Sequence, residues 1–338
     1  MFGLGWLRAL TDARGLLEHA HHGVPRLGEG YTTDDNARAL LYLSLLPEGA
    51  RDEGLVRTYL AFLLHMQKED GRFRNGLTLD GRFEDEGEAE DPTGRAVLAL
   101  AAAQRLPPPY AGPAREALLR ALPALEGFTS LRGRAYALLG LLALPKEPFL
   151  EAAEALGEGL LRAFREAEPA WPYPGPLTYA NHRPVEALYA YGLAFRRQEA
   201  VALARRALAF LKEHYFTPGE EGLFFDPVGN RFMARGRDKP LFDQQPIEAK
   251  CALLAHLRFG ERVLAEVAFL WFHGRNRLRA PLVDAFGPMD GLTPHGPNQN
   301  RGAEALLAYL LAWQALVQGV FPQMDEGVAL GRVFAVGG

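Results

Sequence analysis

A short pattern recurs six times along the 338-residue chain and limits what the chain can fold into. Each copy reads as a variable residue, then Arg or Glu, then Ala, and it starts an apolar stretch. The copies are Ala37-Arg38-Ala39, Gly94-Arg95-Ala96, Gly133-Arg134-Ala135, Val185-Glu186-Ala187, Ile247-Glu248-Ala249 and Ala303-Glu304-Ala305. Successive Arg or Glu positions are 57, 39, 52, 62 and 56 residues apart, which leaves room for two helices and their loops in each interval.

Hydrophobic residues along the chain follow the i, i+3, i+4, i+7 spacing of helices. The stretches that begin at the repeated pattern are almost entirely apolar, which is typical of buried helices. The stretches between them, for example 113–125, are longer and amphipathic, which favours a position partly in water. We therefore predict six inner and six outer helices in an all-α (α/α)6 toroid, with residues 1–338 forming a single domain.

Strand-like material is confined to the connections between helices. Residues 71–83 and 222–234 carry turn residues between alternating hydrophobic residues, as small β-hairpins do. Both lie in long connections, which span residues 66–91, 166–183, 214–246 and 273–300. We expect these hairpins at the end of the ring where the inner helices begin.

The inner helices carry clear start signals. Pro follows Asp91, Arg183 and Gln245, and Thr32 with its neighbours can cap the first inner helix. Because all inner helices of such a ring run in the same direction, their first turns converge at one end. The sequence therefore predicts a polar cleft at that end.

Acidic residues at these helix starts are the candidate catalytic groups. Asp34 and Asp35 precede Arg38, although an Asp at a helix start can also be a simple cap. Glu90 and Asp91 precede Arg95, after Glu86 and Glu88, which are typical of a solvated acidic loop. Glu248, whose alternative role is helix capping, and Glu304 complete the set. Carboxylates held in different environments can divide acid and base roles between them.

Aromatic and amide side chains in the same connections are candidates for binding a sugar, since rings stack on sugar faces and amides bind hydroxyls. Packing within the loops is the alternative for the aromatic residues. The candidates are Tyr31, Trp171, Tyr179, Asn181, His182, Asp243, Gln244, Gln245, Asn298 and Asn300, together with Arg38, Glu90, Arg95 and Glu304.

Composition excludes several other classes. The formal net charge of −4 argues against a nucleic-acid partner. One cysteine, Cys251, excludes an internal disulfide and a cysteine-rich zinc site, so a zinc site with His256 is improbable. A divalent ion between Asp34 and Asp35 lacks further spaced oxygen ligands, and we expect no metal and no cofactor. The start of the chain does not resemble a signal peptide and no long apolar run spans a membrane, so we expect a cytoplasmic protein without a membrane partner.

Four segments carry a resemblance to known proteins. GYTTDDNARAL, EDPTGRAVLAL, FDQQPIEA and DGLTPHGPNQNRGAEALLAYLLA resemble motifs of bacterial toroid proteins encoded beside, or fused to, glycosyltransferases and mannoside-phosphorylase systems. More remotely, the helix pairs resemble the six-hairpin glycosidase superfamily, which uses carboxylates at the open end of the ring. The resemblance implies an oligosaccharide or glycoside substrate, inversion of configuration, and a glycosyltransferase or phosphorylase partner. The chain lacks the two nucleotide-binding α/β domains of a glycosyltransferase.

These patterns leave three functions open, in order of preference. The first is an inverting glycoside hydrolase for mannose-type oligosaccharides, with Asp34 or Asp35 acting with Asp91 or Glu248. The second is a non-catalytic glycan-binding accessory partner of a separate enzyme. The third is a sugar epimerase, which needs a histidine base, and only His182 and His295 are placed for it. A terpene cyclase based on the Asp-Asp pair is weaker, because that chemistry needs an apolar cavity.

Overall fold

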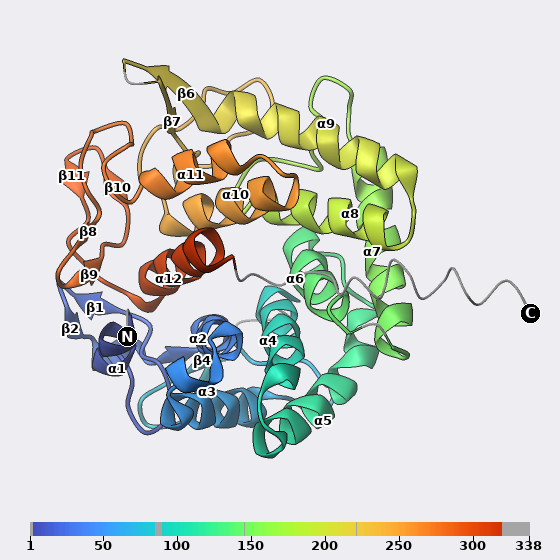
Figure 1. Cartoon of the computed structure of the whole chain (residues 1–338), viewed down its shortest axis with the longest axis vertical. Helices are drawn as coiled ribbons and strands as arrows, with labels where there is room; N and C mark the ends of the chain where they lie inside the picture. Colours follow the sequence, from blue (N-terminus) through green and yellow to red (C-terminus); the bar gives the residue numbers. More distant parts are fainter. Residues whose placement is uncertain (1–2, 85–89, 145, 221, 320–338) are drawn as a thin grey trace, which may run out of the picture.

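The computed structural model describes residues 3–84, 90–144, 146–220 and 222–319, and twelve α-helices lie in these ranges. Six of them form a closed inner ring in which each helix contacts the next and the last contacts the first (Figure 1). The inner helices are α2 (Thr33–Leu45), α4 (Glu90–Ala102), α6 (Leu131–Leu141), α8 (His182–Ala194), α10 (Pro246–Arg258) and α12 (Ala303–Gln318). All six copies of the repeated pattern lie in the first turns of these helices, which confirms the predicted toroid.

The other helices surround this ring, each preceding an inner helix in the chain. They are α1 (Leu4–Ala9), α3 (Glu53–Met66), α5 (Pro108–Leu125), α7 (Phe149–Arg165), α9 (Gln198–Tyr215) and α11 (Arg262–Leu270). Short 3-10 turns lie at Leu27–Glu29, Glu48–Ala50 and Ala103–Arg105. The expectation that outer helices are the longer ones is wrong for α1, with 6 residues, and α11, with 9. No helix in the described ranges is long and apolar enough to cross a membrane.

Local sequence explains where the inner helices begin. The Thr32 side chain accepts a hydrogen bond from the Asp35 backbone N–H and caps α2, and Pro246 is the first residue of α10. Past the first turn these helices are buried almost all round, with side chains such as Leu40, Leu98 and Leu253 at most 4% exposed. The core therefore lies both inside the ring and between its two layers.

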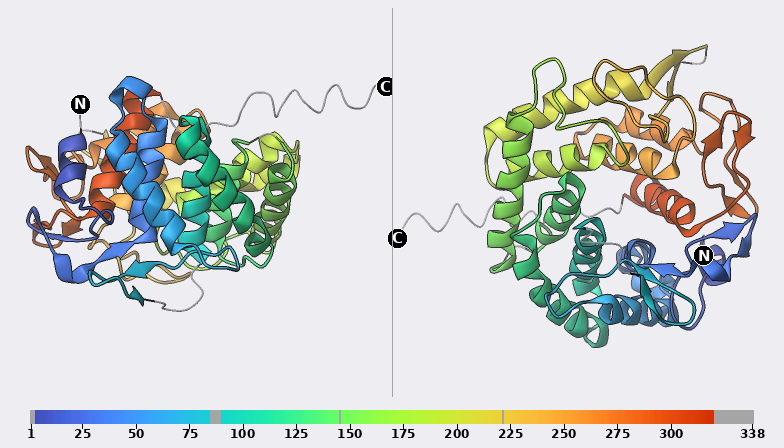
Figure 2. Two further views of the ribbon diagram at one scale, coloured as in Figure 1. Left: turned by 90° about the horizontal axis from the view of Figure 1, so that it is seen from below. Right: turned by 180° about the vertical axis from the view of Figure 1, so that it is seen from behind.

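Short strands decorate the connections, and the β4 and β5 segment lies at one end of the helices (Figure 2). The strands are β1 (Ala20–His21), β2 (Val24–Pro25), β3 (Tyr31–Thr32), β4 (Gly76–Leu77), β5 (Phe83–Glu84), β6 (Phe216–Gly219), β7 (Gly222–Phe225), β8 (Val283–Asp284), β9 (Gly287–Pro288), β10 (Leu292–Thr293) and β11 (Gly296–Pro297). β4 and β5 pair within the predicted 71–83 region, extended by one residue, and β3 joins them as a third strand.

The hairpin expected over residues 222–234 is wrong in its position. β6 pairs with β7, so the hairpin covers residues 216–225 and turns between Gly219 and Gly222. Gly222 has a φ of 95°, which glycine adopts without the strain a side chain would bring. Met233, in the second half of the expected hairpin, instead pairs with Leu177 of another connection.

Candidate active site

The first turns of α2, α4 and α12 meet around one guanidinium group. Arg38 Nη1 lies 2.5 Å from Asp35 Oδ1, and Arg38 Nη2 lies 3.2 Å from Glu304 Oε2. Asp34 is 3.7 Å from Arg38 and its Oδ1 is 3.2 Å from Arg95 Nε. The side chains of Asp34 and Glu304 are 24% and 39% exposed. The structure thus brings these five predicted residues together as a polar floor.

The two adjacent aspartates differ in their surroundings. Asp35 is buried, receives a hydrogen bond from the Thr32 hydroxyl, and has its own N–H bonded to that same hydroxyl. Burial raises its pKa even though Arg38 acts in the opposite direction. Asp34 Oδ1 has no hydrogen-bond partner in the described chain. Asp35 therefore completes the cap of α2, and Asp34 is the aspartate of this pair that faces the floor.

Asp91, in the first turn of α4, is held by three donors. Its Oδ1 accepts a hydrogen bond of 2.7 Å from the Ser130 hydroxyl, and its Oδ2 accepts bonds from Tyr179 at 2.7 Å and Arg132 at 3.2 Å. Burial alone would raise the pKa of Asp91, but the Ser130 bond, the charge of Arg95 and the other two donors lower it. Asp91 is therefore an ionised carboxylate whose oxygens already have partners.

Glu90 is next to Asp91 in the chain but has another role. Its carboxylate accepts hydrogen bonds from the backbone N–H groups of Thr129 and Ser130, just before α6. It holds the start of a helix and is bound to backbone, which leaves it poorly placed for a sugar. Glu86 and Glu88 lie outside the described residues.

Glu248, in the first turn of α10, is 1% exposed. Its Oε1 accepts a hydrogen bond of 2.5 Å from the Ala180 backbone N–H, while its Oε2 has no hydrogen-bond partner among the described residues. Burial raises the pKa of Glu248 to about 8, although the Ala180 N–H and the charge of Arg132 favour the carboxylate. Ala180 has a φ of 51°, a left-handed conformation rare for alanine, so this segment is strained above the carboxyl group.

Four of the predicted sugar-binding residues use their polar atoms elsewhere, and a fifth, His182, is buried without a hydrogen bond among the described residues. Tyr31 donates to Asp12 and Trp171 to the Gly175 carbonyl, while Asn181 donates to the Tyr215 hydroxyl. His182 is fully buried against Tyr215 and His256, and burial lowers its pKa. Gln244 bridges Asp226 and Trp271. These side chains stabilise the connections, and the structure does not bring them to the floor.

The remaining predicted residues lie in the connections. Tyr179 is half-buried, bonded to Asp91, and stacks with Arg132, whose guanidinium carbon is 4.0 Å from the ring centroid. Asp243 is exposed and Gln245 half-buried before α10. Asn298 accepts from the Asn300 N–H, and Asn300 accepts from His22 N–H, so both oxygens shape turns.

Sequence reasoning missed three residues of the site. Arg132 binds Asp91 and Thr178, yet the third repeat stood out only for having no acid. Burial raises the pKa of Glu18 to about 7, with the nearby Asp35 charge adding to the effect, and burial also raises that of Asp290. Asp290 Oδ1 accepts the Gly302 N–H before α12. Arg132 could have been found by its place directly before the third repeat, whereas Glu18 carries no such signal.

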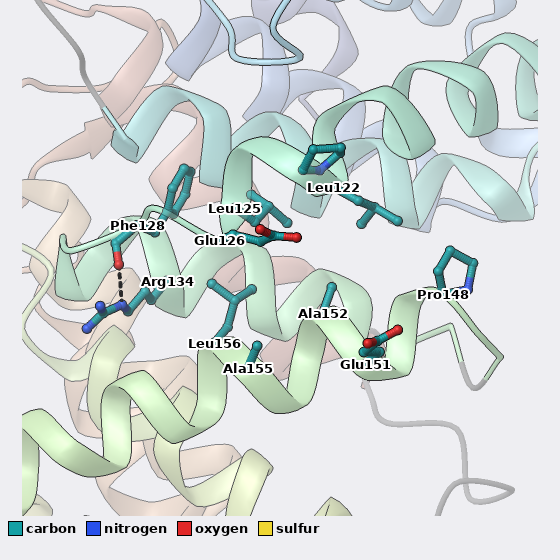
Figure 3. A pocket seen from close by; sticks show the side chains of 11 residues that line it. Leu122, Leu125, Glu126, Phe128, Arg134, Pro148, Glu151, Ala152, Ala155 and Leu156 are labelled. Atoms are coloured by element: carbon teal, nitrogen blue, oxygen red, sulfur yellow. Dashed lines mark hydrogen bonds between the residues drawn. The ribbon is translucent and has the colours of Figure 1, made fainter.

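Arg134, the basic residue of the third repeat, points away from the floor. It donates to the Phe128 carbonyl and lines a hollow of about 380 Å³ on the outer side of α5, α6 and α7 (Figure 3). This hollow lies on the opposite face of α6 from Arg132. It is therefore separate from the candidate site.

Metal ligation has little support in the described ranges, where no group of three or more His, Cys, Asp or Glu side chains could hold an ion. Cys251 is a buried free cysteine. His256 Nδ1 is 2.8 Å from Glu261, so it does not turn toward Cys251 to form the zinc site weighed from the sequence. His295, the other histidine considered as a base, is exposed in the connection before α12.

Solved structures with the same architecture act on sugars, although none is close in sequence. A D-mannose isomerase superposes with a TM-score of 0.69 at 10% identity, covering 94% of this chain and 95% of that one. A cellobiose 2-epimerase from Bacillus thermoamylovorans B4167 gives 0.67 at 8% identity, with 92% and 95% covered. A GH76 α-mannanase from Bacteroides thetaiotaomicron gives 0.62 at 10% identity, with 94% of each chain covered.

These neighbours belong to the six-hairpin glycosidase superfamily and establish the fold of the chain as an (α/α)6 toroid. No family model matches the sequence, and no curated protein matches it.

Proposed function

We propose that the chain is an inverting glycoside hydrolase for mannose-type oligosaccharides, with Glu248 as the general acid and Asp34 as the general base. The observation that carries the proposal is the contrast between Glu248 and the carboxylates of the floor. With a pKa of about 8, Glu248 carries its proton at neutral pH, and its buried Oε2, near the Tyr215 hydroxyl, makes no hydrogen bond of ordinary geometry with the described residues. A carboxyl group kept neutral in this way can protonate a glycosidic oxygen.

The choice of base follows from hydrogen bonding. Asp91 is saturated by Ser130, Arg132 and Tyr179, and Asp35 caps α2. Asp34 is partly exposed, is paired with two guanidinium groups, and has an oxygen free of hydrogen bonds. A partly exposed carboxylate held by guanidinium groups can orient a water molecule and take its proton. Asp91 then acts as the positioning group for Arg132 and Tyr179.

The substrate class is supported by the resemblance of the four motifs and by neighbours that include mannanases. The isomerase and epimerase neighbours support the epimerase alternative. Its candidate bases fit less well, because His182 is fully buried at the start of α8 and His295 is exposed before α12. A partner glycosyltransferase or phosphorylase, a cytoplasmic location and a single domain over 1–338 stay predictions.

The test is a hydrolysis screen against manno-, gluco- and galacto-oligosaccharides with and without phosphate. It compares wild type with Asp34→Asn and Glu248→Gln, and uses Glu199→Gln on the exposed face of α9 as the matched control. We expect turnover by wild type and control, and a loss of about 100-fold or more in both site variants with glycan binding retained.

Saturable glycan binding by all four proteins without any turnover would contradict the hydrolase proposal. It would support the alternative of a non-catalytic glycan-binding accessory protein. Turnover that persists in both site variants would show that other groups act as acid and base.

A further inference from the structure

Four inner helices place basic side chains inside the ring, and two of these, Arg38 and Arg95, belong to the floor. Arg38 of α2, Arg95 of α4, Arg183 of α8 and Lys250 of α10 are all buried, with exposed fractions of 5%, 4%, 3% and 2%. Burial lowers the pKa of Lys250 to about 7, and the charges of Arg38, Arg183 and Arg95 act in the same direction. Such a concentration of cations is costly unless a negative group accompanies it.

Tyr136 of α6 stands at the centre of this group. Its ring lies 4.3 Å from the Arg95 guanidinium carbon and 5.6 Å from that of Arg183. Its hydroxyl is buried and has no hydrogen-bond partner within the described residues. The phenol therefore offers one more polar hydrogen to the interior.

The carboxylates nearby satisfy these donors only in part. Arg38 is paired with Asp35, and Arg95 Nε lies 3.2 Å from Asp34 Oδ1. Glu186 is bound by Arg183 and Arg258, and Glu304 is bound by Arg38 at a terminal nitrogen. The Nε atoms of Arg38, Arg95 and Arg183 and the Nη1 atom of Arg95 are buried and make no hydrogen bond in the described chain. Lys250 likewise has no hydrogen bond or ion pair with the described residues. Each unmet buried donor costs about 1–3 kcal/mol.

All the unmet groups except the Tyr136 hydroxyl are pure donors, since guanidinium and ammonium groups cannot accept hydrogen bonds. The complementary ligand must therefore be rich in acceptors and negatively charged. Guanidinium groups match the oxygens of phosphate and carboxylate, and an ammonium group adds a point charge. A neutral sugar, whose hydroxyls donate as well as accept, would bring no charge to set against the ammonium group of Lys250.

We propose that the interior below the floor binds a small oxyanion through Lys250, Arg95, Arg183 and Tyr136, either free phosphate or the phosphoryl or carboxylate group of an anionic sugar. The proposal rests on the proposed function for the cleft as the glycan site and narrows its substrate to one that is anionic or is bound together with an anion. Asp34 and Glu304, with side chains 24% and 39% exposed, are the parts of the floor that solvent reaches.

The experiment is isothermal titration calorimetry at low, constant ionic strength. The probes are inorganic phosphate, a hexose 6-phosphate, a hexuronate and neutral mannose. The proteins are wild type, Lys250→Met, Tyr136→Phe and the control Lys212→Met, which removes a lysine of α9 paired with Glu261. Removing the ammonium group of Lys250 leaves no other described group without a partner, so we expect Lys250→Met to fold. Circular dichroism checks this.

We expect at least one oxyanion probe to bind wild type saturably and more tightly than mannose. Binding falls about 10-fold or more in Lys250→Met, falls less in Tyr136→Phe, and stays within about twofold in Lys212→Met. Binding of phosphate identifies a free anion, whereas binding of only the hexose phosphate or hexuronate identifies a charge carried by the sugar. The proposal is overturned if no oxyanion binds wild type, or if Lys250→Met binds it equally well.

The two proposals fail separately. Hydrolysis of a neutral oligosaccharide, with no response to any oxyanion, would keep the hydrolase and overturn the anion site. Oxyanion binding lost in Lys250→Met, with no hydrolysis of any glycan, would keep the anion site and overturn the hydrolase.

Discussion

The two sides of the ring use the same helix position for opposite purposes. On the side of α2 and α4 the repeated residue is Arg38 or Arg95, and each is ion-paired with an aspartate from the first turn of α2. On the side of α8 and α10 the repeated residue is itself an acid, Glu186 or Glu248, and both are 1% exposed. The first side keeps two partly exposed acids, Asp34 and Glu304, among its ion pairs, whereas both acids of the second side are buried. Environment, more than residue type, therefore decides which acid carries a proton.

Of the changes that test this comparison, removal of the Glu248 carboxyl group should have the largest effect. We expect Glu248→Gln to lower kcat by a factor of about 10²–10⁴ with little change in KM, because the amide keeps the shape but cannot donate a proton to the leaving oxygen. Initial rates on the best substrate of the screen measure this, and Glu199→Gln on α9 serves as the control. An equal fall in kcat for the control would show that the loss of activity is not specific to Glu248, and it would contradict the role of Glu248 as general acid.

On the side of α8 and α10, Glu186 and Glu248 are both buried but differ in their partners. Glu186 is bound by Arg183 and by Arg258, whose Nε lies 3.0 Å from Glu186 Oε1, and these charges lower its pKa despite burial. We expect Glu186→Gln to destabilise the protein by about 3–5 kcal/mol, because it leaves buried guanidinium groups without a counter-charge. Urea unfolding followed by circular dichroism measures the change. A loss below about 1 kcal/mol would show that these charges are solvated.

The pH dependence of the unfolding free energy tests whether Glu248 is protonated in the folded chain. Glu248 has a pKa of about 8 when folded against a usual value of 4.5, so between these values the folded chain holds a proton that the unfolded chain releases. Stability contributed by Glu248 is full below pH 4.5 and is lost as the pH rises toward 8. Between pH 5 and 7 wild type should lose about 2–3 kcal/mol relative to Glu248→Gln. Parallel unfolding free energies for the two proteins would contradict this.

Much of the fold was accessible from the sequence because it depends on local patterns. The repeated Arg or Glu followed by Ala, the apolar stretches behind it and the prolines near helix starts are all short-range signals, and they predicted the ring and its polar end. The lengths of α1 and α11 and the position of the β6 and β7 hairpin were not predicted. In that hairpin the two glycines, and not the later Gly229, set the turn.

The site was predicted in part for a related reason. Asp34, Arg38, Arg95 and Glu304 meet because helix starts converge, and helix starts are visible in a sequence. Tyr31, Trp171, Asn181, His182 and Gln244 were assigned to the sugar because they lie in the same connections. Their actual partners, such as Asp12 for Tyr31 and Trp271 for Gln244, depend on which way each side chain turns. No spacing rule reports that direction.

A smaller change in stability tests the helix cap of α2, on the side of the ring formed by α2 and α4. Thr32 caps α2 through the Asp35 N–H and also donates to the Asp35 carboxylate. Thr32→Ala should cost about 1 kcal/mol of stability, the usual value of a helix cap. Thermal unfolding compared with Thr58→Ala, a threonine on the exposed part of α3, measures it. A cost no greater than that of Thr58→Ala would show that Asp35 alone maintains the start of α2.

The most direct test of the account is an infrared titration of the carboxyl groups, taken as the difference between wild type and Glu248→Gln. The account predicts a protonated carboxyl band that persists at pH 7 and disappears with a midpoint near 8. A band that disappears near pH 4.5, the usual value for glutamate, would show that Glu248 is ionised at neutral pH and cannot be the general acid.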